Sequence, residues 1–122
     1  MNYTTGINRN SGKLWVDIPG FQIMHYVRMP QSATGFRIVA TGAEIDFDGG
    51  TYRSESDSSP VFSTGREPVA PMRLSMGINK RSKHPLFVAL SIQFFKLIGN
   101  KLEKVAQREY ASAIVAVSQG DK

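Results

Sequence analysis

The thirteen residues LFVALSIQFFKLI, from Leu86 to Ile98, constrain the fold of this chain more than any other segment, because ten of them are apolar. A transmembrane helix needs about 20 residues, so this segment is too short to cross a bilayer. It fits a buried helix, and it also fits a strand, because its even-numbered positions are all apolar except Lys96. The fold class therefore depends on which of these two periods the segment follows.

Three features favour a helix over residues 86–98. Thirteen residues is long for a strand but ordinary for a helix. Pro85 suits the first turn of a helix that Ser82 would cap, and Gly99 stands where a left-handed C-terminal cap belongs. The apolar residues that follow, from Leu102 to Val117, also recur at helical spacing, which predicts a second helix.

The residues before this segment alternate between apolar and polar, which is typical of half-buried strands. Alternation is clearest over residues 43–48, where Ala, Ile and Phe alternate with three acids. Asp48-Gly49-Gly50 then supplies a hairpin turn into a return strand at 51–56. Similar patterns predict further strands at residues 13–18, 21–29 and 72–78.

These patterns together predict one α+β domain over residues 1–122, in which an antiparallel sheet of five or six strands precedes two C-terminal helices. Residues 1–10 are polar, and we expect them to form a loose N-terminal arm. The alternative is an all-β sandwich or barrel, with 86–98 and 101–110 paired as a hairpin. The chain is long enough for one hydrophobic core without disulfides, and it has no cysteine.

Positive charge is concentrated in the C-terminal part of the chain. The net charge is +5, but residues 1–72 have six Lys and Arg against seven acids, whereas residues 73–122 have nine against three. Lys80, Arg81 and Lys83 precede the predicted helix start, where free N–H groups also favour a phosphate. We therefore expect a surface that binds anions. Its candidate residues are Lys80, Arg81, Lys83, His84, Lys101, Lys104 and Arg108.

A second candidate site is a polar and aromatic patch for a small ligand. It combines the polar side of the 13–18 strand with the 21–29 strand, and its candidate residues are Trp15, His25, Tyr26 and Arg28. The two histidines belong to no metal-binding motif, and the sequence contains no nucleophile or phosphate-loop motif. We accordingly predict no metal site, no cofactor and no catalytic residue.

The apolar 86–98 segment also predicts a protein partner. A helix with so narrow a polar stripe has more apolar surface than one thin sheet covers, and an identical copy is the simplest way to bury the excess. The residues predicted to form this interface are Phe87, Leu90, Phe94, Phe95 and Ile98.

Our first hypothesis is a non-enzymatic binding or assembly protein, homo-oligomeric through 86–98, whose basic C-terminal surface binds an anionic partner such as nucleic acid. The alternative is a small-ligand-binding domain with its pocket between sheet and helices, and a third hypothesis is a small hydrolase that uses His25. The N-terminus lacks a secretory signal pattern, and the lack of cysteine fits a reducing compartment. We therefore expect a soluble, cytoplasmic protein with no membrane partner.

Overall fold

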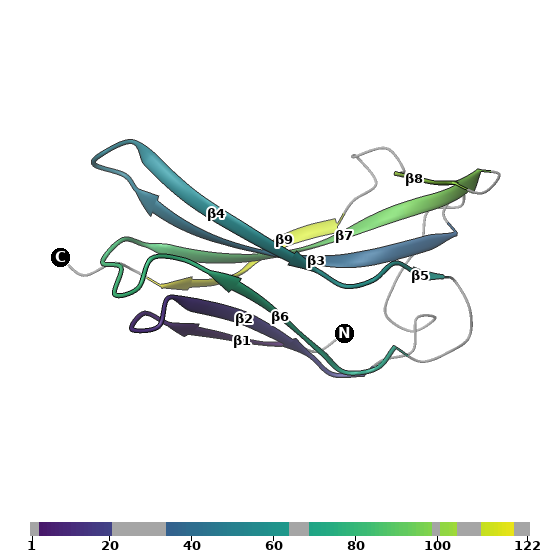
Figure 1. Ribbon diagram of the computed structural model, residues 1–122, viewed down its shortest axis with the longest axis horizontal. Helices are drawn as coiled ribbons and strands as arrows, with labels where there is room; N and C mark the ends of the chain where they lie inside the picture. Colours follow the sequence, from purple (N-terminus) through teal and green to yellow (C-terminus); the bar gives the residue numbers. More distant parts are fainter. Residues whose placement is uncertain (1–2, 21–33, 64–68, 99–100, 105–110, 119–122) are drawn as a thin grey trace.

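In the computed structural model the chain forms two antiparallel β-sheets that lie face to face (Figure 1). The structure describes residues 3–20, 34–63, 69–98, 101–104 and 111–118. Within these ranges, β-strands are the only regular secondary structure, and no residue is helical. The strand predicted at 21–29 lies outside the described residues.

Among the described residues, the smaller sheet contains three strands, in the order β1 (Thr4–Asn8), β2 (Lys13–Ile18) and β6 (Met72–Gly77). The strands predicted at 13–18 and 72–78 are therefore present, and the apolar side of each faces the other sheet. Residues expected in a loose arm contribute a strand here, because Thr4–Asn8 pair in register with β2.

In the described part of the chain, the larger sheet contains six strands. Its path is β4 (Thr51–Ser58), β3 (Gly35–Asp46), β7 (Leu86–Ile98) and β8 (Lys101–Lys104), while β5 (Phe62–Ser63) pairs with β3 and β9 (Ala111–Ser118) pairs with β7. The predicted hairpin is present as β3 and β4, and Gly50 in its turn has a φ of 69°. Such a positive φ suits a residue without a side chain.

The prediction of two C-terminal helices is wrong. Residues 86–98 form strand β7, and β8 and β9 pair with its two halves along one edge. β7 lies in the interior of the sheet, so Leu86, Val88, Leu90 and Phe94 enter the core while Phe95, on the other face, is also buried. A strand buried on both faces has a nearly continuous apolar sequence, which cannot be distinguished from a buried helix by its pattern. The described part of the chain is thus all-β rather than α+β.

The hydrophobic core lies between the two sheets. It contains side chains that are at most 7% exposed, from Leu14, Val16, Ile18, Leu74 and Met76 on one side to Phe36, Ile38, Ala40, Leu86, Val88, Leu90 and Phe94 on the other. Gly42 marks a close approach of the layers, because a Cβ at this position would lie 2.5 Å from Leu14 Cδ1 and 3.3 Å from Met76 Cβ. A side chain at position 42 would therefore have to displace Leu14, which is completely buried in the core.

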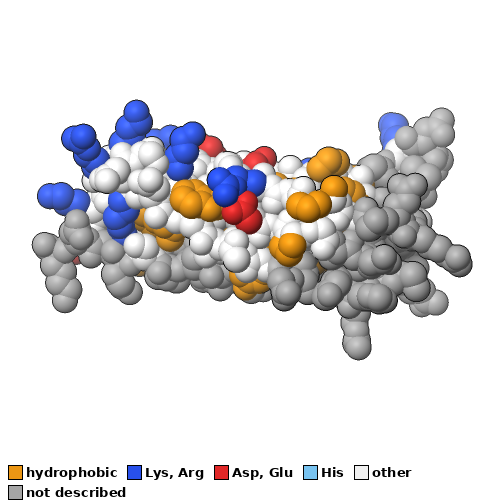
Figure 2. Space-filling model, turned by 90° about the horizontal axis from the view of Figure 1, so that it is seen from below, with side chains coloured by type: hydrophobic (Ala, Val, Ile, Leu, Met, Phe, Trp, Pro, Cys, Tyr) orange, Lys and Arg blue, Asp and Glu red, His pale blue; other side chains and the backbone are white. Residues whose placement is uncertain are grey.

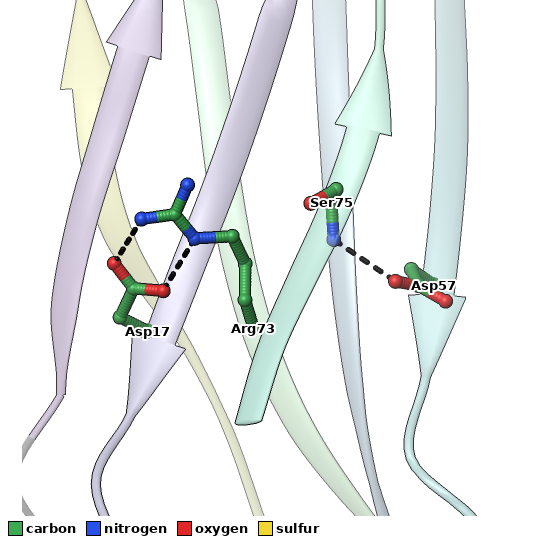
Figure 3. A network of polar contacts seen from close by, with 4 residues as sticks. All are labelled: Asp17, Asp57, Arg73 and Ser75. Carbon is green, nitrogen blue, oxygen red and sulfur yellow. Dashed lines mark hydrogen bonds and ion pairs between the residues drawn. The ribbon is translucent and has the colours of Figure 1, made fainter. Parts of the chain in front are cut away.

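Carboxylates of β4 join the two sheets along one side. Asp57 Oδ2 accepts a hydrogen bond of 2.9 Å from the Ser75 amide, as Figure 3 shows, and Glu55 Oε1 accepts one of 2.9 Å from the Gly77 amide. Both amides belong to β6, the edge strand of the smaller sheet. The bonds therefore occupy donors that another strand would need for pairing with β6.

We predict that Gly42→Val lowers the free energy of unfolding by about 1–3 kcal/mol, because the added methyl groups overpack the space between the sheets. Gly77→Val is the matched control, because its Cβ would meet Glu55 at an ordinary 3.6 Å. Urea denaturation of both variants measures the difference. Equal losses in the two variants would contradict the assignment of Gly42 to a tight contact.

Candidate anion-binding site

Four exposed cations lie on two neighbouring connections at one end of the sandwich. Lys80, Arg81 and Lys83 belong to the β6–β7 loop, and Lys13 begins β2, directly after the β1–β2 turn. Backbone hydrogen bonds hold the connections together, with Ile78 N–H donating to Gly12 O at 2.7 Å. Figure 2 shows Lys and Arg side chains gathered at this end of the molecule, on the left of the view. We call Lys13, Lys80, Arg81 and Lys83 the basic end.

Arg9 fixes the conformation of the β6–β7 loop. Its Nη1 donates to Ser82 O at 2.8 Å and to His84 O at 2.9 Å, while Nη2 donates to the carbonyl and hydroxyl of Ser118, at 3.0 and 2.9 Å. Within the same loop Arg81 has a φ of 58°, a left-handed conformation that costs a non-glycine residue about 1–2 kcal/mol. Contacts from outside the loop must offset this cost, and Arg9 supplies them.

A polar depression of about 150 Å³ adjoins the basic end. It lies between the β3–β4 hairpin and the β6–β7 loop, and its lining residues are Glu44, Asp46, Thr51, Tyr52, Arg53, Asn79 and His84. Asn79 connects two of these groups, because its Oδ1 accepts from Arg53 Nη1 at 2.7 Å and its Nδ2 donates to Glu44 Oε1 at 2.9 Å. The depression therefore offers fixed donors and acceptors at its wall.

Two aromatic rings are exposed on the hairpin that borders this depression. Tyr52 is 77% exposed and Phe47 is 68% exposed. The hairpin contacts the loop region directly, because Ile45 N–H donates to Pro85 O at 3.1 Å. The same end of the molecule thus combines cations with accessible rings, the two kinds of group that bind phosphates and bases.

The structure brings together only part of the predicted anion-binding set. Lys80, Arg81, Lys83 and His84 are exposed before the start of β7, whereas Lys101 lies opposite Ile98 at its far end. A strand of this length spans about 40 Å, so the two groups form separate surfaces. The side chain of Lys104 and all of Arg108 lie outside the described residues. Lys13, which the sequence pattern missed, joins the set only because two distant connections meet in the fold.

The predicted aromatic patch is described only at Trp15, since His25, Tyr26 and Arg28 lie outside the described residues. Trp15 is half-buried, and the guanidinium of Arg73 lies over its ring at 5.3 Å. Arg73 also donates two hydrogen bonds to Asp17, at 2.6 and 2.8 Å, as drawn in Figure 3. Hydrogen bonds from Arg73 lower the pKa of Asp17 below its ordinary value.

The residues predicted to form an oligomer interface are largely covered by their own chain. Leu90, Phe94 and Phe95 are between 3% and 7% exposed, Phe87 is half-buried and Ile98 is exposed. Because β-sheet neighbours cover three of these five side chains, their apolar character requires no second copy.

Among the described residues, no three His, Cys, Asp or Glu side chains are arranged to hold a metal ion. In the same part of the chain, no helix has the length and apolar character needed to span a membrane. No known family model, curated protein or solved structure matches the chain. The function must therefore be inferred from the chemistry of the site itself.

We predict that Arg9→Ala lowers the free energy of unfolding by about 1–3 kcal/mol, because carbonyls of the β6–β7 loop and Ser118 lose a charged donor. Arg9→Lys should be nearly as destabilising, since a single ammonium cannot replace the fork of a guanidinium. Thermal denaturation compares the three proteins. Wild-type stability in Arg9→Lys would show that charge, rather than the fork, is what matters.

We expect Arg73→Gln to raise the pKa of Asp17 toward that of an ordinary aspartate, because it removes the cation that stabilises the carboxylate. Since the folded pKa is lowered, the pair stabilises the protein above the unfolded pKa, and this contribution is lost as pH falls through the folded pKa. Carboxyl NMR titration of both proteins measures the shift. An unchanged titration in Arg73→Gln would contradict the stated cause.

Proposed function

We propose that this protein is a non-enzymatic binding protein that holds single-stranded nucleic acid at its basic end. One observation carries the proposal. Backbone hydrogen bonds hold the β1–β2 turn against the β6–β7 loop, and this places Lys13 near Lys80, Arg81 and Lys83. Because the backbone of both connections is held in place, these cations start from neighbouring positions, and such a cluster favours anion binding more than scattered lysines do.

Electrostatics supplies the affinity in this proposal. Each cation that contacts a phosphate displaces condensed counterions, so affinity falls as salt is added. The overall net charge of +5 also favours the approach of a polyanion. These contributions do not depend on the base sequence.

The exposed rings favour a single strand over a duplex. Unpaired bases can stack on Tyr52 and Phe47, whereas the bases of a duplex are already stacked on each other. The hairpin that carries these rings also carries Asp46 and Asp48, which repel phosphate. We therefore place the phosphates along the β6–β7 loop and the bases toward the hairpin.

Fluorescence anisotropy with labelled oligonucleotides of about 16 nucleotides, single-stranded and duplex, tests the proposal. The double variant Lys80→Glu/Lys83→Glu should weaken single-strand binding by about tenfold or more and reduce the slope of log affinity against log salt by about 1.4. Its matched control is Lys96→Glu/Lys101→Glu, which changes the same number of exposed charges at the other end of β7.

In this control, the proposal predicts that the affinity for single strands falls by about twofold at most. Lys96 and Lys101 lie more than a screening length from the basic end, so salt largely screens their charges from a nucleic acid bound there. Equal losses in both double variants would show non-specific attraction by net charge and would end the proposal. Tyr52→Ala separates the two contributions, since loss of stacking should weaken single-strand binding and leave the salt slope unchanged.

A further inference from the structure

The larger sheet ends at an exposed strand. Within the described ranges β4 pairs with β3 alone, and each of the six residues from Thr51 to Ser56 is exposed. Alternate residues of an edge strand point their N–H and C=O groups away from the sheet, where another strand can pair with them. An edge of this length therefore presents a surface for strand addition.

The edge of the smaller sheet at β6 differs, because some of its backbone N–H groups already have hydrogen-bond partners. Glu55 and Asp57 occupy the amides of Gly77 and Ser75, so β6 is closed to a further strand. The same carboxylates extend from β4 toward β6 and leave the backbone edge of β4 open to the side. One edge is thus blocked and its neighbour is available.

The sequence of β4, TYRSESDS, is complementary to itself in one antiparallel register. With a two-fold axis at Ser54, Arg53 of each copy lies opposite Glu55 of the other, which gives two pairs of opposite charge. An axis at Glu55 would oppose two carboxylates, and an axis at Arg53 would oppose two guanidinium groups. An axis at Ser56 would place Glu55 opposite Asp57 on both sides.

We infer that β4 binds β4 of a second copy in the register centred on Ser54, so that one continuous sheet passes through both molecules. This register pairs residues of the same face, and the two cores therefore stay on the same side of the sheet. Glu55 has two carboxylate oxygens, so it can keep its bond to Gly77 and accept from the opposite arginine. Arg53 can likewise keep its bond from Nη1 to Asn79, because its guanidinium has other N–H donors. Tyr52 lies opposite the small Ser56, which leaves its ring accessible.

Cysteine cross-linking tests the register. The chain has no cysteine, so Ser54→Cys creates a single thiol that the inferred axis places next to its own copy. Ser58→Cys is the matched control, because it is exposed on the same face but lies about 27 Å from its counterpart in this register. Under mild oxidation of nucleic-acid-free protein, Ser54→Cys should form disulfide dimer at least about tenfold faster. Equal rates would overturn the inference.

Light scattering provides an independent measurement of mass. The wild-type protein should approach twice its 13.5 kDa chain mass as concentration rises, and a constant monomer mass would overturn the inference.

Arg53→Glu should weaken the dimer by opposing carboxylates, and Arg53→Glu/Glu55→Arg should restore it by exchanging the charges. Failure of the exchange to restore mass in a folded protein would exclude this register. The inference stands apart from nucleic-acid binding, which these experiments do not measure.

Discussion

The bonds from β4 carboxylates to β6 amides determine how the two sheets lie on each other. Glu55 and Asp57 fasten one side of the sandwich, and Arg9 fastens the other through Ser82 and Ser118. Between these sides the layers approach so closely that a side chain at Gly42 would displace the buried Leu14. Burial drives the sheets together without direction, whereas these polar contacts select one arrangement of them. The positions of both loops at the basic end follow from that arrangement.

Strands with a clear alternation of apolar and polar residues could be predicted from the sequence, whereas β1 and β7 could not. β2 and β6 alternate clearly, because water on one side selects polar residues there. Alternation over residues 43–48 located the β3–β4 hairpin but not its inner face, since Glu44 is buried and Phe47 is exposed. β7 lacks that contrast, since Leu90 and Phe95 are both buried although they lie on opposite faces. β8 and β9 complete the edge of β7, so the error at 86–98 carried over to the residues after it.

The candidate site was predictable only as far as it is local in the chain. The loop with Lys80, Arg81 and Lys83 is exposed whether a helix or a strand follows it. Its exposure could therefore be predicted although the secondary structure predicted after it was wrong. Lys13 could not be predicted, because no pattern shows that the β1–β2 turn packs against this loop. The same limit applies to Lys101, whose separation from the loop depends on β7 being extended.

The contact between Arg9 and Ser118 joins residues 109 positions apart. During synthesis, Arg9 leaves the ribosome early, and its hydrogen bonds to Ser118 can form only after β9 has emerged. Contacts between residues so far apart in sequence also slow folding, because the entropy of closing a large loop is lost before the contact can stabilise the fold. The network in which Arg9 holds both the β6–β7 loop and Ser118 is therefore completed only once β9 has been synthesised.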